Sequence, residues 1–275
     1  MGITINSNLA SLTAQRNLNL SQASLATSIA RLSSGLRITR ASDDAAGLAI
    51  SEKLNAQIRS FAQASRNAAN GISVVATAEG TLNEVTNLLV RMRELATQAA
   101  SGDMGTAERG NLNSEYVALR DEIDRMVGST QFNGATLFSA GGTVTMSFQI
   151  GINAGDALAV GIKDSHVSAL AGALSGSNIA EVSSATAMLA QLDTAIGAVT
   201  TNRGELGAAQ NRLEAIIRNL SVTIETTTAA NSRIRDVDVA EETAAYTRNQ
   251  ILVQAGVSVL AQANQMPSVA LSLLK

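Results

Sequence analysis

The sequence predicts a mainly α fold of long antiparallel, coiled-coil-like helices with one small β-hairpin, whose N- and C-terminal helices pair in an inner helical domain. First, apolar residues recur in alternating steps of three and four over residues 189–224, with only Arg203 and Gln210 as polar interruptions. This spacing is typical of a coiled-coil seam. Second, a similar stripe runs over residues 54–96. Third, the apolar period falls to two over residues 143–162, which predicts a hairpin.

Composition argues against several function classes. Only 2% of the 275 residues are aromatic, and the sequence has no Trp and no Cys. Aromatic side chains supply much of the area of compact cores and pockets, so an extended helical protein is favoured over an enzyme. A net charge of −3 offers no basic face to nucleic acid. Without Cys there are no disulfides or thiolate metal sites, and we expect no catalytic residue, cofactor or metal ion.

The N-terminal segment predicts a helix from Ile3 to Leu36 that is almost free of charge. Its first charged residue is Arg16, so the start lacks a basic n-region and predicts no secretory signal peptide. A helix without an adequate polar face is buried on most sides. The residues expected to pack in self-assembly lie at helical spacing: Leu18, Leu25, Ile29, Leu32 and Leu36.

The C-terminal segment has the same character, since residues 249–274 contain no charge at all. Its many Asn and Gln side chains would be costly in lipid, so we expect a helix buried by protein and no membrane insertion. Pro267 has no amide hydrogen and is expected to kink or end this helix, leaving residues 268–275 as a separate turn. The residues expected to join the assembly face are Val253, Val257, Leu260, Leu271 and Leu274.

Between its ends the chain goes out and returns. Ser34-Gly35 interrupts the first helix, and Ser42 is predicted to cap a second helix over residues 45–100, with Asp43 and Asp44 in its first turn. A third helix, capped by Thr106, is expected to reach Gly128.

The later elements follow from the change of period and from turn residues. A tight turn is predicted at residues 132–135, before the hairpin. Residues 163–177 are rich in Gly, Ala and Ser, so we expect them to be irregular and tolerant of variation. A long helix then returns over residues 181–230, followed by a joint at residues 232–235 and the final helix.

This out-and-back order predicts the domain organisation. We expect an inner core domain made of the N-terminal helix, residues 1–42, and the C-terminal helix, residues 232–275. The outer helical domain would consist of residues 43–175, which carry the hairpin, and of the returning helix, residues 176–231. Both ends of the chain are expected to bury each other and neighbouring copies, because neither has a face suited to water.

Five blocks carry a family resemblance. They are residues 31–38 (RLSSGLRI), 43–50 (DDAAGLAI), 131–134 (QFNG), 232–241 and 262–274. In this order they resemble bacterial flagellin, the subunit of the flagellar filament, over the whole chain. The resemblance implies an inner domain that lines the filament channel and an outer helical domain with a β-hairpin. It also implies a short flagellin, because the large surface domains of longer members would be inserted near residues 163–177.

The same resemblance implies a function and partners. A flagellin leaves the cell unfolded through the flagellar export apparatus, is bound by an export chaperone at its C-terminal helix, and polymerises under a filament cap protein beyond the hook-filament junction proteins. The expected location is the extracellular filament, and the expected role is structural, in swimming motility. Arg91, Leu95 and Glu115 match positions at which a host Toll-like receptor contacts the family. The alternative for Arg91 and its neighbours is a solvated face with helix-local ion pairs.

Other candidate sites have simpler explanations. His166 has no Cys or second His to share a metal ion. Asp43 and Asp44 are better explained as helix N-terminal residues than as a catalytic pair. Arg203 and Gln210 either set pairing register in the seam or extend to its edge.

Rival functions remain at the level of sequence. The nearest is a flagellin-like hook-filament junction protein, present in few copies. A flagellin with an enzymatic insertion would need more chain than residues 163–177 supply. A coiled-coil adhesin or injection-apparatus tip protein would share the helices but not the block at residues 43–50.

Overall fold

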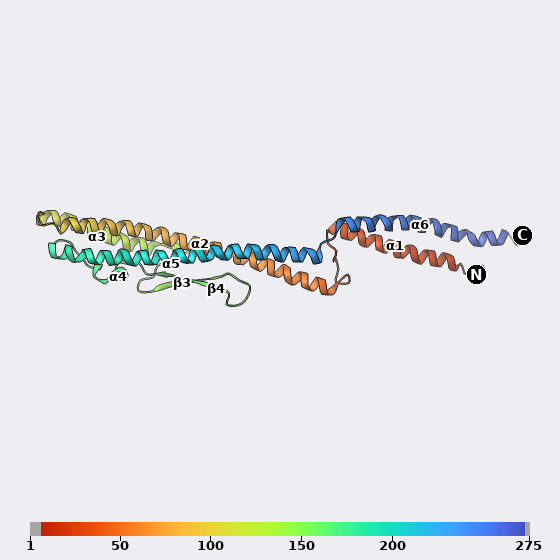
Figure 1. The fold of residues 1–275 in the computed structure, drawn as a ribbon, viewed down its shortest axis with the longest axis horizontal. Coiled ribbons are helices and arrows are strands. Elements are labelled where there is room, and N and C mark those ends of the chain that lie inside the picture. The colour runs from red at the N-terminus through yellow and green to blue at the C-terminus, as the bar shows by residue number, and fades with distance from the viewer. Residues whose placement is uncertain (1–6, 273–275) are drawn as a thin grey trace. The chain divides into compact units, whose positions relative to one another are not determined.

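Long helices dominate the computed structural model, which confirms the mainly α prediction (Figure 1). It describes the backbone of residues 7–272, and the side chains in that range except those of residue 173 and residues 267–272. The chain divides into two compact units, one within residues 1–58 and 225–275 and the other within residues 59–224. The assignment of segments to inner and outer filament layers, with boundaries at residues 42 and 232, stays a prediction.

The first unit pairs the two ends of the chain. Helices α1 (Leu9–Ser34) and α6 (Val239–Ser272) lie side by side and antiparallel (Figure 1). The predicted pairing of the terminal helices is therefore confirmed. The predicted beginning of the first helix at Ile3 lies outside the described residues.

A main-chain joint ends α1 and connects it to the segment before α6. Gly35 takes a left-handed conformation (φ 72°) and donates to the Arg31 carbonyl at 2.8 Å, which is the usual glycine end of a helix. The Arg37 N–H donates to the Arg235 carbonyl at 2.7 Å, and the Val237 N–H donates to the Gly35 carbonyl at 3.1 Å. The two segments are thus held together by backbone hydrogen bonds before α6 begins.

Two predicted helix caps are wrong. Helix α2 (Ala45–Ala99) is capped by Asp44, whose Oδ1 accepts from the Gly47 N–H at 2.8 Å, and not by Ser42. Asp43 instead closes the preceding turn: the Thr39 hydroxyl and the Thr39 and Arg40 N–H groups donate to it and lower the pKa of its carboxyl. Helix α3 (Thr106–Ser129) begins at Thr106 and has no side-chain cap. Asp44 directly precedes the first helical residue, Ala45, and so occupies the N-cap position, whereas Ser42 lies two residues too early to reach the free N–H groups.

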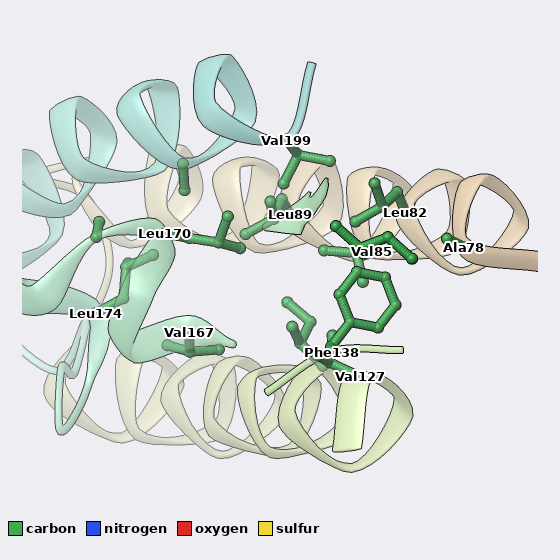
Figure 2. Close-up of a cluster of buried hydrophobic side chains, with 14 of the residues drawn as sticks. Ala78, Leu82, Val85, Leu89, Val127, Phe138, Val167, Leu170, Leu174 and Val199 are labelled. Carbon is green, nitrogen blue, oxygen red and sulfur yellow. The ribbon is translucent and has the colours of Figure 1, made fainter. Parts of the chain in front are cut away.

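The second unit has its core between α2, α3 and α5 (Val182–Arg235). Leu192, Val199, Leu206 and Leu213 of α5 are at most 2% exposed, which confirms the predicted seam. Figure 2 shows Val199 gathered with Leu82, Val85 and Leu89 of α2 and with Val127 of α3. The main cluster of buried apolar residues lies between residues 68 and 213, so this unit owes nothing to the terminal helices for that cluster.

The polar residues of the seam lie at its edge. Arg203 is paired with Glu79 of α2 at 3.6 Å, and Gln210 donates to Glu214 of its own helix at 3.1 Å. Both are partly exposed, which favours the edge explanation over a buried register contact. A buried polar contact missed by the sequence lies one residue earlier: Asn202 is 8% exposed and donates to the Ser165 hydroxyl at 3.3 Å.

The segment expected to be irregular contributes to the core. It forms the short helix α4 (Val167–Leu170) and the 3-10 turn η1 (Gly172–Leu174). Val167, Leu170 and Leu174 are at most 5% exposed (Figure 2). The expectation that this segment is irregular is therefore wrong for these residues, because their side chains fill space between the long helices. The expected tolerance of variation stays a prediction.

Two hairpins complete the second unit. Strands β1 (Gln131–Phe132) and β2 (Ala135–Thr136) are joined by Asn133 (φ 51°) and Gly134 (φ 80°), which confirms the predicted tight turn. Strands β3 (Thr143–Gln149) and β4 (Ala157–Lys163) pair antiparallel, as predicted. Alternate residues of β4, namely Leu158, Val160 and Ile162, are buried, so one face of this hairpin packs on the core.

Arg109 of α3 bonds carbonyls at the end of α2, and substitution can test this contact. Arg109 is 9% exposed and donates from Nε to the Ala99 carbonyl at 3.0 Å and from Nη2 to the Ser101 carbonyl at 3.1 Å. Arg109→Met keeps the stem but leaves both carbonyls without this donor, so we expect the free energy of unfolding to fall by about 1–3 kcal/mol in urea titrations. Arg125→Met is the control: Arg125 is exposed and pairs only within its helix with Glu122, so it should cost below about 0.5 kcal/mol. Equal losses of unfolding free energy in the two variants would contradict a stabilising role for the bonds from Arg109 to these two carbonyls.

His166, Asp164 and Gly141 form a hydrogen-bonded cluster just after the end of β4, which we call the polar clip. The His166 Nδ1 is 2.6 Å from Asp164 Oδ1, and the Asp164 carboxylate also accepts from the N–H groups of His166 and Gly141. Burial raises the pKa of the Asp164 carboxyl, but these hydrogen bonds outweigh burial and bring that pKa below its ordinary value. His166 therefore has a structural partner, and the carboxylate holds two loops together.

The Asp164 carboxylate of the polar clip makes the free energy of unfolding depend on pH in the acidic range. A folded pKa below the unfolded value of about 3.9 means that the carboxylate stabilises the fold fully above pH 4 and loses this as the pH falls through the folded pKa. Asp164→Asn should therefore be less stable than the parent at about pH 6 and should lose less stability between about pH 6 and pH 3. Urea unfolding over this pH range measures both slopes. Parallel pH profiles would show that Asp164 is not the group responsible.

Candidate self-assembly surface

The facing sides of α1 and α6 bury small and apolar residues. Leu18 is 9% exposed and packs on Gly256, where an added Cβ would lie 3.2 Å from Leu18 Cδ1. Ser28 and Ala263 are 4% and 6% exposed. Arg31 and Glu242 form an ion pair at 3.5 Å near the joint. The inner line of contact is therefore narrow, and it covers only part of each helix.

The residues predicted to pack in self-assembly differ in how far they are buried. Apart from buried Leu18, five are partly buried: Leu25, Leu32, Leu36, Val253 and Leu260. Ile29 and Val257 are 50% and 53% exposed. The side chain of Leu271 and the whole of Leu274 lie outside the described residues.

Other apolar side chains of the same helices are exposed to a similar or greater extent than Ile29 and Val257. We call this group, together with Ile29 and Val257, the outer apolar set. Each member is between 48% and 71% exposed. Its further members are Leu9, Leu12, Leu20, Val239, Ile251, Leu252, Val259 and Met266. Following a single stripe missed them, although the near absence of charge from these helices was a usable signal.

An ionic cleft of about 620 Å³ opens between α1 and α6 near the joint. Arg31, Arg37 and Arg233 line it together with the acids Asp238 and Glu242. The two signs of charge are mixed, which suits neither an anionic cofactor nor a cation. Among residues 7–272, no cluster of three or more His, Cys, Asp or Glu side chains is placed to hold a metal ion.

The segment that resembles a receptor contact lies in the other unit. Arg91 donates to Glu115 of α3 at 2.9 Å and to Glu94 at 3.0 Å, and these acids raise the pKa of its guanidinium. Arg91 and Glu115 are thus brought together at the surface. Leu95 is 1% exposed and belongs to the core, so only two of the three predicted residues are available to a partner.

No described helix combines the length and apolarity needed to span a membrane.

Sequence profiles of two families match the chain. Residues 5–143 match the bacterial flagellin N-terminal helical region, and residues 189–274 match the bacterial flagellin C-terminal helical region.

Relatives and solved structures agree with these matches. The chain is 46% identical to a flagellin of Halalkalibacterium halodurans, with 98% of this chain and 99% of the relative covered. It is 42% identical to flagellin FlaB2 of Treponema pallidum over the same shares. A crystal structure of Bacillus cereus flagellin is similar at 31% identity and a TM-score of 0.51, covering 56% of this chain and 88% of that one. A putative flagellar hook-associated protein of Vibrio parahaemolyticus shares the fold at 18% identity and a TM-score of 0.61, covering 70% and 100%. The chain, with paired terminal helices and no large outer domain, belongs to the bacterial flagellin family.

Proposed function

We propose that this chain is a structural subunit that polymerises into the bacterial flagellar filament for swimming motility, and that the outer apolar set of α1 and α6 forms the contact between copies. The observation that carries the proposal is the exposure of this set on two helices that have few charges of their own. Unpartnered apolar surface of this extent marks an interaction site. A second copy of the chain presents the same exposed apolar side chains and can cover those of the first. Contacts between identical copies that do not close into a ring generate a helical filament.

The magnitude of the effect indicates why both helices are required. Full burial of a Leu or Val side chain stabilises by roughly 1.5–3 kcal/mol, so covering half-exposed side chains gives about 1 kcal/mol each. The outer apolar set then contributes on the order of 10 kcal/mol per copy. Association costs about 4–15 kcal/mol in lost freedom. The gain from one helix alone lies near the lower end of this cost, whereas the two together reach the middle of its range.

The finer parts of the proposal rest on family membership. The subunit would be exported through the flagellar export apparatus, held before export by a chaperone on the uncharged C-terminal helix, and added under the filament cap beyond the junction proteins. It would act outside the cell and without enzymatic activity. A host Toll-like receptor would meet the exposed pair Arg91 and Glu115, while Leu95 would act only as packing beneath them.

Seeded polymerisation tests the main proposal. Purified full-length protein added to short filament fragments should lengthen them into long filaments visible by electron microscopy. Replacement of Leu20 and Leu252 together by Ser should raise the critical concentration for this growth by about twentyfold or more while leaving the helix content unchanged. Protein that stays monomeric on seeds, or that caps them without growth, would overturn the proposal and favour the junction protein.

The filament function is preferred to the junction protein for a specific reason. The relatives that match nearly the whole chain at 42–46% identity are named flagellins. The hook-associated structure, at 18% identity, is evidence for the fold alone.

A further inference from the structure

Helix α6 continues through a proline. It runs from Val239 to Ser272 without interruption, so the prediction that Pro267 ends the helix is wrong. Proline has no N–H, and the carbonyl four residues earlier, that of Ala263, therefore lacks its helical donor. Ala263 is 6% exposed, so water is a poor substitute for that donor.

The missing donor comes from the other end of the chain. Asn8 Nδ2 donates to the Ala263 carbonyl at 2.7 Å. This hydrogen bond stands in for the one that a non-proline residue at 267 would make. It removes the cost of a buried carbonyl without a partner, which is one reason for the helix to persist past Pro267.

The same amide also begins α1. Asn8 is the N-cap of α1, and its Oδ1 accepts from the Ser11 N–H at 3.1 Å. An amide carries both an acceptor and donors, so one side chain serves a free N–H of α1 and a free carbonyl of α6. Ser or Asp would cap α1 equally well, but neither would place an amide donor on Ala263.

We propose that Asn8 is a positioning residue that fixes the register of α1 against α6 by bonding the carbonyl that Pro267 leaves free. A slip of one residue would move that carbonyl by about 1.5 Å and turn it about the helix axis, and it would break the contact. Leu18 on Gly256 and Arg31 with Glu242 lie in the same antiparallel register. The inference rests on the proposed function, because the register sets which apolar side chains of the two helices form one surface for the next copy.

A double-mutant cycle tests this in the full-length chain. Asn8→Ser keeps the cap but removes the donor, and we expect the critical concentration for seeded growth to rise about tenfold, equal to about 1.4 kcal/mol. Pro267→Ala restores the helical donor, so Asn8→Ser added to Pro267→Ala should change the critical concentration by less than about twofold. Ser11→Ala is the matched control. It removes the exposed bond from Ser11 Oγ to Asn264 Oδ1, at 2.6 Å, and should have less than a twofold effect in either background.

Two results would overturn the inference: an Asn8→Ser effect no larger than that of Ser11→Ala, or a tenfold effect that persists with Ala at 267. Thermal melting of the same proteins, followed by circular dichroism, provides a second reading of the cycle. If the parent protein does not grow on seeds, the proposed function fails, and the melting cycle alone decides whether Asn8 and Pro267 are coupled. Melting temperatures that add independently would then reject the coupling.

Discussion

A chain that lacks residues 1–40 will form no filaments on seeds, and neither will a chain that lacks residues 236–275. Either deletion removes one of the two helices that carry the outer apolar set, and the remaining helix offers only about 4–6 kcal/mol of burial, near the lower end of the cost of association. The second unit should remain folded, because its main buried cluster lies between residues 68 and 213 and includes no residue of either terminal helix. Electron microscopy measures growth, and circular dichroism with urea unfolding measures the remaining helices.

The control for this experiment is a change that shortens the chain away from the terminal helices. Replacing the turn at residues 151–155, between β3 and β4, with a shorter turn should leave seeded growth possible, because this turn belongs to the other unit. Long filaments from either terminal truncation would contradict the assembly role of α1 and α6. Loss of all helix signal in the truncated chains would contradict the independence of the second unit.

Leu89→Ala and Leu20→Ala should separate stability from assembly. Leu89 of α2 is fully buried in the cluster of Figure 2, and its truncation should reduce the free energy of unfolding of the second unit by roughly 2–5 kcal/mol. Leu20 of α1 is 62% exposed, so its truncation should change that free energy by less than about 0.5 kcal/mol. It should instead raise the critical concentration for growth about fivefold, through about 1 kcal/mol of lost burial between copies.

Both quantities are needed for each variant. Urea unfolding followed by circular dichroism gives the stability, and pelleting of filaments gives the critical concentration. If Leu20→Ala left growth unchanged, this part of α1 would not be covered in the filament. If Leu89→Ala left unfolding unchanged, the core between the long helices would be too loosely packed to matter.

Periodic patterns gave correct predictions of the elements. The seam of α5 was predicted from residues 189–224 because apolar residues at steps of three and four lie on one face of an α-helix. The stripe residues Leu192, Val199, Leu206 and Leu213 are buried as expected. The alternation in residues 143–162 identified β3 and β4 for the same reason. The turn at Asn133 and Gly134 followed from backbone preferences of single residues. All of these are local properties.

Predictions that depended on competition between nearby groups were less secure. Asp44 and not Ser42 caps α2, because several polar groups within a few residues could each have taken the free N–H groups. Residues 163–177 read as a variable loop, yet Val167, Leu170 and Leu174 are buried. No periodicity exists in so short a segment, and only its position between the long helices makes its apolar residues part of the core.

Composition and the spacing of residues along one chain are enough to predict the helical class, the order of the elements and the shortage of charge at both ends. Which apolar residues of α1 and α6 face each other, and which remain exposed, depends on how the two helices pack in the fold. Because these helices are apolar on several sides, no single stripe identified the inner face. The passage of α6 through Pro267 was decided in the same way. Asn8 lies far away in sequence and reaches the free carbonyl only when the two ends of the chain are folded together.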